Sequence, residues 1–263
     1  MPVELTVKAI LFDMDGTLVD STPAVEKALG DWAQRQGMQP NEFFQHSHGV
    51  RTQDNIKRFQ TTPVPGHTLD ETQLAEAVRE LELEIAETGR RLHAAGGKGI
   101  ERLPGAGELL DALRKGGARW GICTSATRLY ADSALETGEI GSTPPALPFL
   151  ITGDICEHGK PHPEPYLRGM DELRKLGGPS FQFDPSEVLV VEDAPSGLKS
   201  GLAAGCKTLG VATGQPMERF RTFEATVKVV DLTRVEVVHA SPESVTLRIE
   251  TLEEEEVSLN GSA

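Results

Sequence analysis

The sequence predicts an α/β protein in which helices cover both faces of a parallel sheet and a helical domain is inserted into the chain. Short apolar runs alternate with helical patterns, an order typical of parallel strands joined by helices. Several of these runs end in polar or acidic residues. Because ligands bind beyond the carboxyl ends of such strands, we expect these residues to meet in one crevice.

Five apolar runs are the candidate strands of the sheet, and each has the length of a buried strand. They are residues 7–12, 120–123, 149–152, 188–191 and 208–211. Four of them end in polar residues, which we expect at the crevice. These residues are Asp13, then Thr124 and Ser125, then Gly153 and Asp154, and finally Glu192 and Asp193.

The stretch between the first run and Leu103 has helical rather than strand spacing. Its apolar residues fall on one helical face, namely Leu74, Val78, Leu81, Ile85 and Leu92. Pro104 and Gly105 mark the return to the sheet pattern. We therefore predict an inserted helical domain over residues 21–103 and a main domain made of residues 1–20 and 104–263.

The later part of the chain contains a turn-rich segment and further strand patterns. The segment 141–148 interrupts the path to the third apolar run. Apolar alternation in residues 226–230, 235–238 and 245–249 predicts extra strands, with a hairpin turn at Ser241-Pro242.

Composition excludes several classes of protein. The formal net charge of -14 argues against a nucleic-acid partner, and the glutamate run at residues 253–256 is expected to be a solvated tail. The three cysteines lack metal-ligand spacing, so we expect reduced, buried thiols. The chain opens without a cleavable signal pattern and holds no apolar run of the ~18 residues that span a membrane. We expect a soluble cytoplasmic monomer with no membrane partner.

Asp13 and Asp15 are the first candidates for catalysis. Residues two apart on an extended chain point the same way, so both carboxylates can face one ligand. Cleavage of a phosphate ester needs a nucleophile and a proton donor for the departing alkoxide, and carboxylates can serve as both. A solvated acidic turn is the alternative, but Gly16 and Thr17 directly after the pair favour a nucleophile at Asp13 and a general acid at Asp15.

A metal ion is expected because two carboxylates would repel a phosphate dianion. Glu192 and Asp193 follow a buried-strand pattern and supply further carboxylates. With Asp13, the backbone carbonyl of Asp15 and a phosphate oxygen, they can complete an oxygen octahedron for Mg²⁺. Asp193 is the preferred ligand and Glu192 the second. An acidic pair that caps the following helix is the alternative.

Two further positions supply groups for phosphate. Thr124 and Ser125 can donate hydrogen bonds to phosphate oxygens, although a serine or threonine there can equally cap the next helix. Lys160 lies in a loop stiffened by three prolines and can place a fixed positive charge beside the phosphate. An ordinary surface lysine is the alternative for Lys160.

As an ordered set, the segment Asp13 to Thr17, Ser125, Lys160 and the pair Glu192-Asp193 resemble the haloacid dehalogenase superfamily. The resemblance implies a Rossmann-like core and an α-helical cap inserted after the first motif. It implies roles for the motif residues: Asp13 as nucleophile, Asp15 as acid and base, Ser125 and Lys160 on the phosphate, Thr17 and Ala126 at the substrate, and Mg²⁺ at Asp13, Asp15 and Asp193.

Within that superfamily the chain looks most similar to fungal phosphatases of glycerol phosphate and 2-deoxyglucose 6-phosphate. Residues 47–52, 126–128 and 159–166 carry this likeness. It implies that His48, Gly49 and Arg51 in the cap reach the substrate. Without the resemblance, His48 reads as a packed or exposed histidine and Arg51 as a solvated residue.

The combined interpretation is a magnesium-dependent phosphatase of a small phosphorylated metabolite. A phosphosugar mutase is the main alternative, but the resembling mutases carry a histidine in the cap hinge and residues 20–25 contain none. The dehalogenase branch lacks an aspartate at the position of Asp15. A non-catalytic binding protein would have lost a nucleophile or a metal ligand, and this sequence keeps them all.

Overall fold

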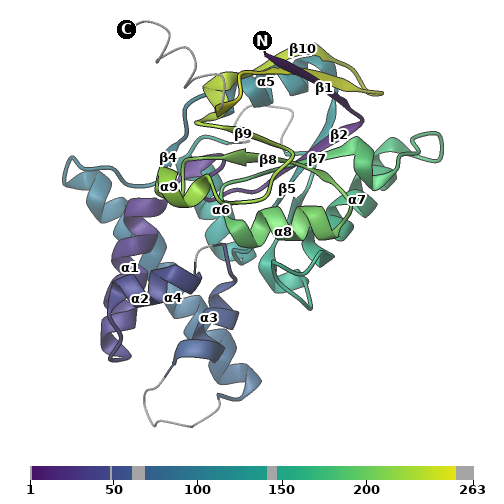
Figure 1. The fold of residues 1–263 in the computed structure, drawn as a ribbon. Helices are drawn as coiled ribbons and strands as arrows, with labels where there is room; N and C mark the ends of the chain where they lie inside the picture. The colour runs from purple at the N-terminus through teal and green to yellow at the C-terminus, as the bar shows by residue number, and fades with distance from the viewer. Residues whose placement is uncertain (1, 48, 61–68, 141–146, 253–263) are drawn as a thin grey trace, which may run out of the picture.

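Six parallel strands form the central sheet of the computed structural model, which describes residues 2–47, 49–60, 69–140 and 147–252. The strand order is β6-β5-β2-β7-β8-β9 (Figure 1). All five predicted runs are confirmed as strands of this sheet, and the predicted strand near residue 226 is its sixth member. The bounds are β2 Ala9–Phe12, β5 Arg119–Cys123, β6 Leu150–Ile151, β7 Val188–Glu192, β8 Lys207–Val211 and β9 Val227–Val229.

Helices bury both faces of this sheet, as predicted. Alternate residues of β2 enter different hydrophobic clusters, since Ile10 and Phe12 pack on one face and Ala9 and Leu11 on the other. The first cluster contains leucines of α5 and α6, and the second contains residues of α7. The helices of this part of the chain are α5 Ala106–Gly116, α6 Arg128–Thr137, α7 Glu164–Gly177, α8 Pro195–Ala203 and α9 Met217–Phe220.

A second, antiparallel sheet contains both ends of the described chain. Its order is β1-β11-β10, with β1 at Val3–Val7, β10 at Val235–Ala240 and β11 at Val245–Ile249. The predicted hairpin is confirmed, and Ser241 N donates to Ser244 O at 2.9 Å in its turn. The prediction of one strand over residues 7–12 is wrong at its start. Val7 ends β1 and Ala9 begins β2, because the chain changes sheets at Lys8.

Four helices follow the first site motif and pack on one another away from the central sheet (Figure 1). They are α1 Thr22–Arg35, α2 Pro40–Ser47, α3 Thr52–Phe59 and α4 Glu71–Ala94. The chain leaves through β3 Val19–Asp20 and returns through β4 Glu101–Arg102, which pair antiparallel. The stretch that the sequence predicted as helical is thus helical in the structure. The domain limits at residues 20 and 103 stay a prediction.

Two expectations from the composition, on the cysteines and on membrane-spanning segments, can be compared with the structure. All three cysteines are free and buried thiols. In the parts of the chain that are described, no helix combines the length and apolar character needed to cross a bilayer. The expected tail at residues 253–256 and most of the turn-rich segment 141–148 lie outside the described residues.

Leu247→Ala should lower the free energy of unfolding by about 2–5 kcal/mol while leaving the sites at the strand ends intact. Leu247 is 1% exposed and belongs to the hydrophobic cluster that joins β11 to α5. Urea unfolding followed by circular dichroism measures the change. The exposed Val238 of β10 is the matched control, and an equal loss in Val238→Ala would contradict the packing argument.

Candidate active site

The ends of neighbouring strands bring the predicted polar residues together. Asp13 directly follows β2, and Asp193 directly follows β7, which pairs with β2 in parallel register. Ser125 lies two residues beyond β5, on the other side of β2. Lys160 reaches the same place from the loop between β6 and α7. The convergence follows from parallel strands that end at one edge of the sheet.

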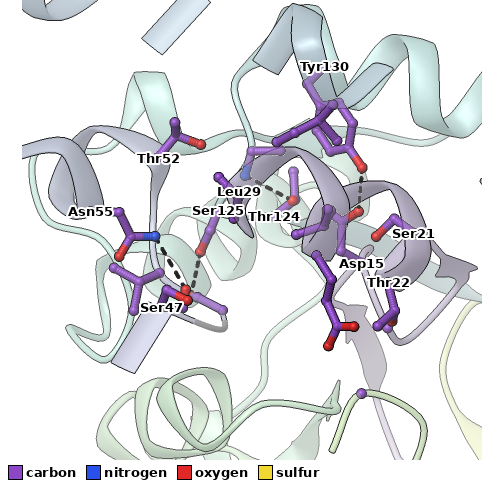
Figure 2. Close-up of a pocket in the computed structure, with 18 of the residues that line it drawn as sticks. Asp15, Ser21, Thr22, Leu29, Ser47, Thr52, Asn55, Thr124, Ser125 and Tyr130 are labelled. Carbon is purple, nitrogen blue, oxygen red and sulfur yellow. Dashed lines mark hydrogen bonds between the residues drawn. The ribbon is translucent and has the colours of Figure 1, made fainter. Parts of the chain in front are cut away.

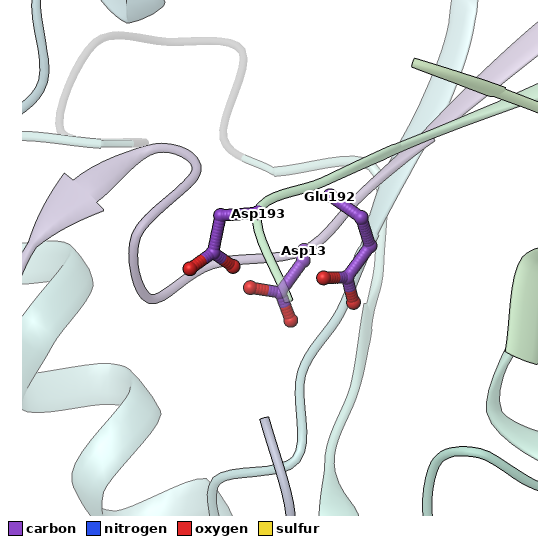
Figure 3. A group of neighbouring side chains, drawn as sticks. All are labelled: Asp13, Glu192 and Asp193. Carbon is purple, nitrogen blue, oxygen red and sulfur yellow. The ribbon is translucent and has the colours of Figure 1, made fainter. Parts of the chain in front are cut away.

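Three carboxylates form the centre of this arrangement (Figure 3). One oxygen each of Asp13, Glu192 and Asp193 lies within 4.8 Å of the others, and all three side chains are buried. Burial raises the pKa of Asp13 to about 8, and the charge of Glu192 acts in the same direction. Burial, Glu192 and Asp13 also raise the pKa of Asp193. The site therefore has a strong demand for positive charge.

Lys160 supplies part of that charge. Its Nζ donates to Asp13 Oδ1 at 2.5 Å, to Glu192 Oε1 at 2.7 Å and to the carbonyl of Cys123 at 2.9 Å. Burial lowers the pKa of Lys160, but the adjacent Asp13 and Glu192 together raise it by more than burial lowers it. The ammonium therefore stays charged. Tyr166 Oη donates to the same Glu192 oxygen at 2.8 Å. The alternative of an ordinary surface lysine is excluded, because the Lys160 side chain is fully buried.

Two glycines fix the position of Asp193. Gly16 has φ +77°, and a Cβ there would lie 2.3 Å from Asp193 Oδ2. A Cβ at Gly214 would lie 1.7 Å from the same oxygen. Any larger residue at either position would collide with the carboxylate, so Gly16 follows the two aspartates for a steric reason.

Asp15 lies apart from the three carboxylates and faces hydroxyl groups. Tyr130 Oη donates to Asp15 Oδ1 at 2.9 Å (Figure 2), and Ser21 also hydrogen-bonds this side chain. Burial raises the pKa of Asp15, which favours the protonated form. A carboxyl group whose pKa is raised keeps its proton to a higher pH, which suits a general acid.

A cavity of about 110 Å³ opens above these groups and is shared between the four-helix unit and the sheet (Figure 2). Asp13, Asp15 and Asp193 line its floor. The polar residues of its other walls are Ser21, Thr22, Glu26, Ser47, Thr52, Asn55, Glu82, Thr124, Ser125 and Tyr130. The remaining lining residues are apolar side chains and glycines, namely Val25, Leu29, Phe44, Val50, Ile85, Ala126, Gly16, Gly49 and Gly214.

Ser125, Ala126 and Gly49 meet where the two parts of the chain touch. Ser125 Oγ donates to the carbonyl of Gly49 at 3.0 Å, and all three residues line the cavity (Figure 2). Ala126 N donates to Thr124 Oγ1 at 3.1 Å. The structure therefore places Ser125, Ala126 and Gly49 at the predicted crevice.

Arg51 and Thr17 do not line this cavity, and their expected places at the ligand stay a prediction. Arg51 turns away from the cavity, with Nε on Asp54 at 2.7 Å and Nη1 on the carbonyl of Cys156 at 2.7 Å. Its guanidinium joins α3 to the loop before Lys160 instead of facing the floor. Thr17 is fully buried in the turn after Asp15 and does not line the cavity. The expected role of His48 falls outside the described residues.

Asp13 and Asp193 fit a hard divalent cation such as Mg²⁺, since both offer buried carboxylate oxygens at close range. Glu192 fits less well as a direct ligand. Its Oε1 accepts from Lys160 and Tyr166, and its Oε2 accepts from Ala194 N at 3.2 Å. Of Asp15, the backbone carbonyl is the expected ligand, because the side chain is turned to Tyr130.

Sequence reasoning missed several residues of the site. Tyr130 and Tyr166 are the chain's only two tyrosines, and each hydrogen-bonds a carboxylate of the site. Glu82 is buried in α4 and lines the cavity. The sequence did indicate that Glu82 is unusual, because it lies four residues after Val78 and three before Ile85, on the apolar face of a predicted helix.

Lys160→Ala should lower the free energy of unfolding by about 3–5 kcal/mol at pH 8, because it leaves Asp13 and Glu192 buried without their cation. Lys160 lowers the pKa of Asp13, so without the ammonium the folded-state pKa of Asp13 rises further. This carboxyl then protonates as the pH falls, and the loss should shrink at pH 5.5. Urea unfolding at both pH values tests this. The exposed Lys199 is the control, and a loss independent of pH would contradict the ion-pair explanation.

The chain is similar to several known proteins. Residues 7–205 match the family model described as "Hydrolase: haloacid dehalogenase-like hydrolase". Hexitol phosphatase A of Escherichia coli is 37% identical over 78% of this chain and 82% of its own length. Glycerol-1-phosphate phosphohydrolase 2 of Saccharomyces cerevisiae is 39% identical over 81% of this chain and 77% of its own length.

A third relative matches nearly the full length of both proteins. The 2-deoxyglucose-6-phosphate phosphatase 1 of Saccharomyces cerevisiae is 33% identical over 94% of this chain and 96% of its own length. The resemblance to fungal phosphatases of these two kinds is thereby confirmed. From the matched family model and the likeness to these relatives, the chain belongs to the haloacid dehalogenase-like hydrolases.

Proposed function

We propose that the chain is a magnesium-dependent phosphatase of small phosphate monoesters, with Asp13 as nucleophile and an aspartyl-phosphate intermediate. The observation that carries this proposal is the contact of Asp13 with Lys160. One oxygen of Asp13 is held by the ammonium at 2.5 Å, while the carboxylate lies on the floor of a cavity beside Asp15. The nucleophile is thus fixed in orientation at a site that a small ester can enter.

Asp13 and Asp193, with the backbone carbonyl of Asp15, would hold the Mg²⁺. When bound, the ion would neutralise charge among these carboxylates and on the phosphate, so that a dianion can approach. Lys160 contributes a second, permanent positive charge beside Asp13. Glu192 holds that ammonium in place through its own contact at 2.7 Å.

The two aspartates divide the chemistry. A carboxylate oxygen of Asp13 attacks phosphorus, and the bond from phosphorus to the alcohol oxygen breaks. Asp15, whose pKa is raised by burial, gives its proton to the departing oxygen. Asp15 then takes a proton from the water that attacks the aspartyl-phosphate, which releases phosphate and restores Asp13. Tyr130 keeps the Asp15 carboxyl directed across the cavity.

We also propose that residues 21–103 act as a cap that closes over the ester. Polar contacts join this segment to the rest of the chain: Arg51 to the carbonyls of Cys156 and Glu157, and Gly49 to Ser125. Closure of this kind excludes bulk water from the reacting phosphate. It also limits the size of the substrate, so a small phosphorylated metabolite fits better than a phosphoprotein.

The relatives support the class of ester. Their names assign them glycerol 1-phosphate, hexitol phosphates and 2-deoxyglucose 6-phosphate, all of which carry hydroxylated leaving groups. We infer a polyol or sugar phosphate for this chain on that basis. Hydrolysis is preferred to phosphoryl return within the substrate, because residues 20–25 contain no histidine.

Asp13→Asn should lower kcat for glycerol 1-phosphate in the presence of Mg²⁺ by at least about 10⁴-fold, because the amide is a poor nucleophile. Phosphate release measures the rate, and circular dichroism checks that the fold remains. Asp171→Asn, at an exposed position of α7 that does not line the cavity, is the control and should keep activity. Near-normal hydrolysis by Asp13→Asn, or undiminished wild-type rates after chelation of divalent ions, would refute the proposal.

Asp15→Asn should slow alkyl phosphates much more than aryl phosphates, because only the poor alkoxide leaving group needs its proton. A general acid contributes typically about 10²–10⁴-fold, so the alkyl loss should lie in that range. The comparison uses glycerol 1-phosphate and 4-nitrophenyl phosphate under single-turnover conditions. Equal losses for both esters would show that Asp15 is not the acid.

A further inference from the structure

The wall of the cavity contributed by the cap carries negative charge. Glu82 lines the cavity from α4, and Glu26 lines it from α1. Glu82 is only 2% exposed, whereas Glu26 is largely exposed and so lies toward solvent. Among the described residues that line the cavity there is no lysine, arginine or histidine. A leaving group that enters this region meets carboxylates and hydroxyls, without a described cation.

Glu82 is held rigidly in this place. Its Oε1 accepts from Thr52 Oγ1 at 2.9 Å and from Thr127 N at 3.4 Å, and its other oxygen accepts from Thr127 Oγ1. These hydrogen bonds lower the pKa of Glu82, but burial is the larger effect and raises it. A carboxylate has roughly four lone-pair directions, so it can accept a further hydrogen bond from the cavity. Thr52 and Thr127 therefore fix the carboxylate without saturating it.

A second polar group faces the same space. Ser47 lines the cavity and is 4% exposed, yet its Oγ has no hydrogen-bond partner among the described residues. Beside it, Asn55 Nδ2 donates to the backbone carbonyl of Ser47 at 3.3 Å, so that carbonyl is already engaged (Figure 2). A buried hydroxyl without a partner costs free energy unless a ligand or water meets it. Ser47 is thus suited to a polar ligand atom.

We propose that Glu82, with Ser47, selects phosphate esters whose leaving group is uncharged and carries hydroxyl groups, and rejects those that carry a carboxylate or a second phosphate. This rests on the phosphatase proposed above. A substrate hydroxyl can donate to Glu82 and can accept from or donate to Ser47. A substrate carboxylate cannot donate, and its charge is repelled by Glu82 at short range where little water screens it.

Glycerol 1-phosphate and 3-phosphoglycerate test this directly, because they differ only by a terminal hydroxymethyl group against a carboxylate. The full-length chain with Mg²⁺ should show kcat/KM at least about 100-fold higher for glycerol 1-phosphate. Glu82→Gln should reduce this ratio by roughly tenfold or more, mainly through faster phosphoglycerate hydrolysis. Glu80→Gln, an exposed position on the same helix, should leave the ratio unchanged.

The assays distinguish a role of Glu82 in specificity from a purely structural role, and both from failure of the proposed phosphatase activity. If Glu82→Gln lowers kcat/KM equally for both esters, Glu82 only holds the fold and the proposal is overturned. Comparable wild-type rates for the two esters overturn it as well, even where Glu82→Gln is too unstable to assay. The leaving group of 4-nitrophenyl phosphate carries no charge, so its hydrolysis by the wild type tests the phosphatase activity independently of Glu82. If the wild type does not hydrolyse this ester, the proposed function is wrong.

Discussion

The buried contact of Lys160 with Asp13 and Glu192 is the interaction on which the rest of the site depends. Three carboxyl groups and one ammonium are buried together, so the group holds more acidic side chains than cations to pair with them. Such a cluster is costly unless each charge has a partner. Tyr166 and the backbone N–H of Ala194 satisfy Glu192, whereas Asp13 and Asp193 remain for a cation. The hydrogen bonds thus leave Glu192 fully engaged, whereas Asp13 and Asp193 keep oxygens that could bind a cation.

The fold makes this concentration of charge possible. Adjacent parallel strands β2 and β7 end at the same level, which sets Asp13 beside Glu192 and Asp193. Their apolar residues are buried on both faces, so the strands cannot shift without exposing the core. Gly16 and Gly214 then let backbone approach the carboxylate of Asp193 from two directions. The rigid sheet imposes the proximity that isolated carboxylates would avoid.

The sequence was sufficient for the sheet, the inserted helices and the residues at the strand ends, because each depends on local spacing. Ile10 to Phe12 followed by Asp13 is a buried strand with a polar end whatever surrounds it. Arg51, Tyr130 and Glu82 could not be placed in the same way, since the contacts that position them join residues 30 or more positions apart in the chain. For example, Arg51 binds the carbonyl of Cys156 across 105 residues. Only tertiary packing decides such pairs.

The N-terminus of α6 connects the cavity residues at the end of β5 to Glu82 of α4. Ser125 and Ala126 line the cavity just before the helix, and Thr127 is its N-cap residue. Thr127 has no side-chain cap of its own, and its N–H and hydroxyl are met by Glu82 from the cap. The positive end of the helix dipole favours a carboxylate there. In the proposed phosphatase, the contact that stabilises the buried Glu82 would also keep its charge beside the leaving group, so the proposed cap closure and the proposed selectivity would share one residue.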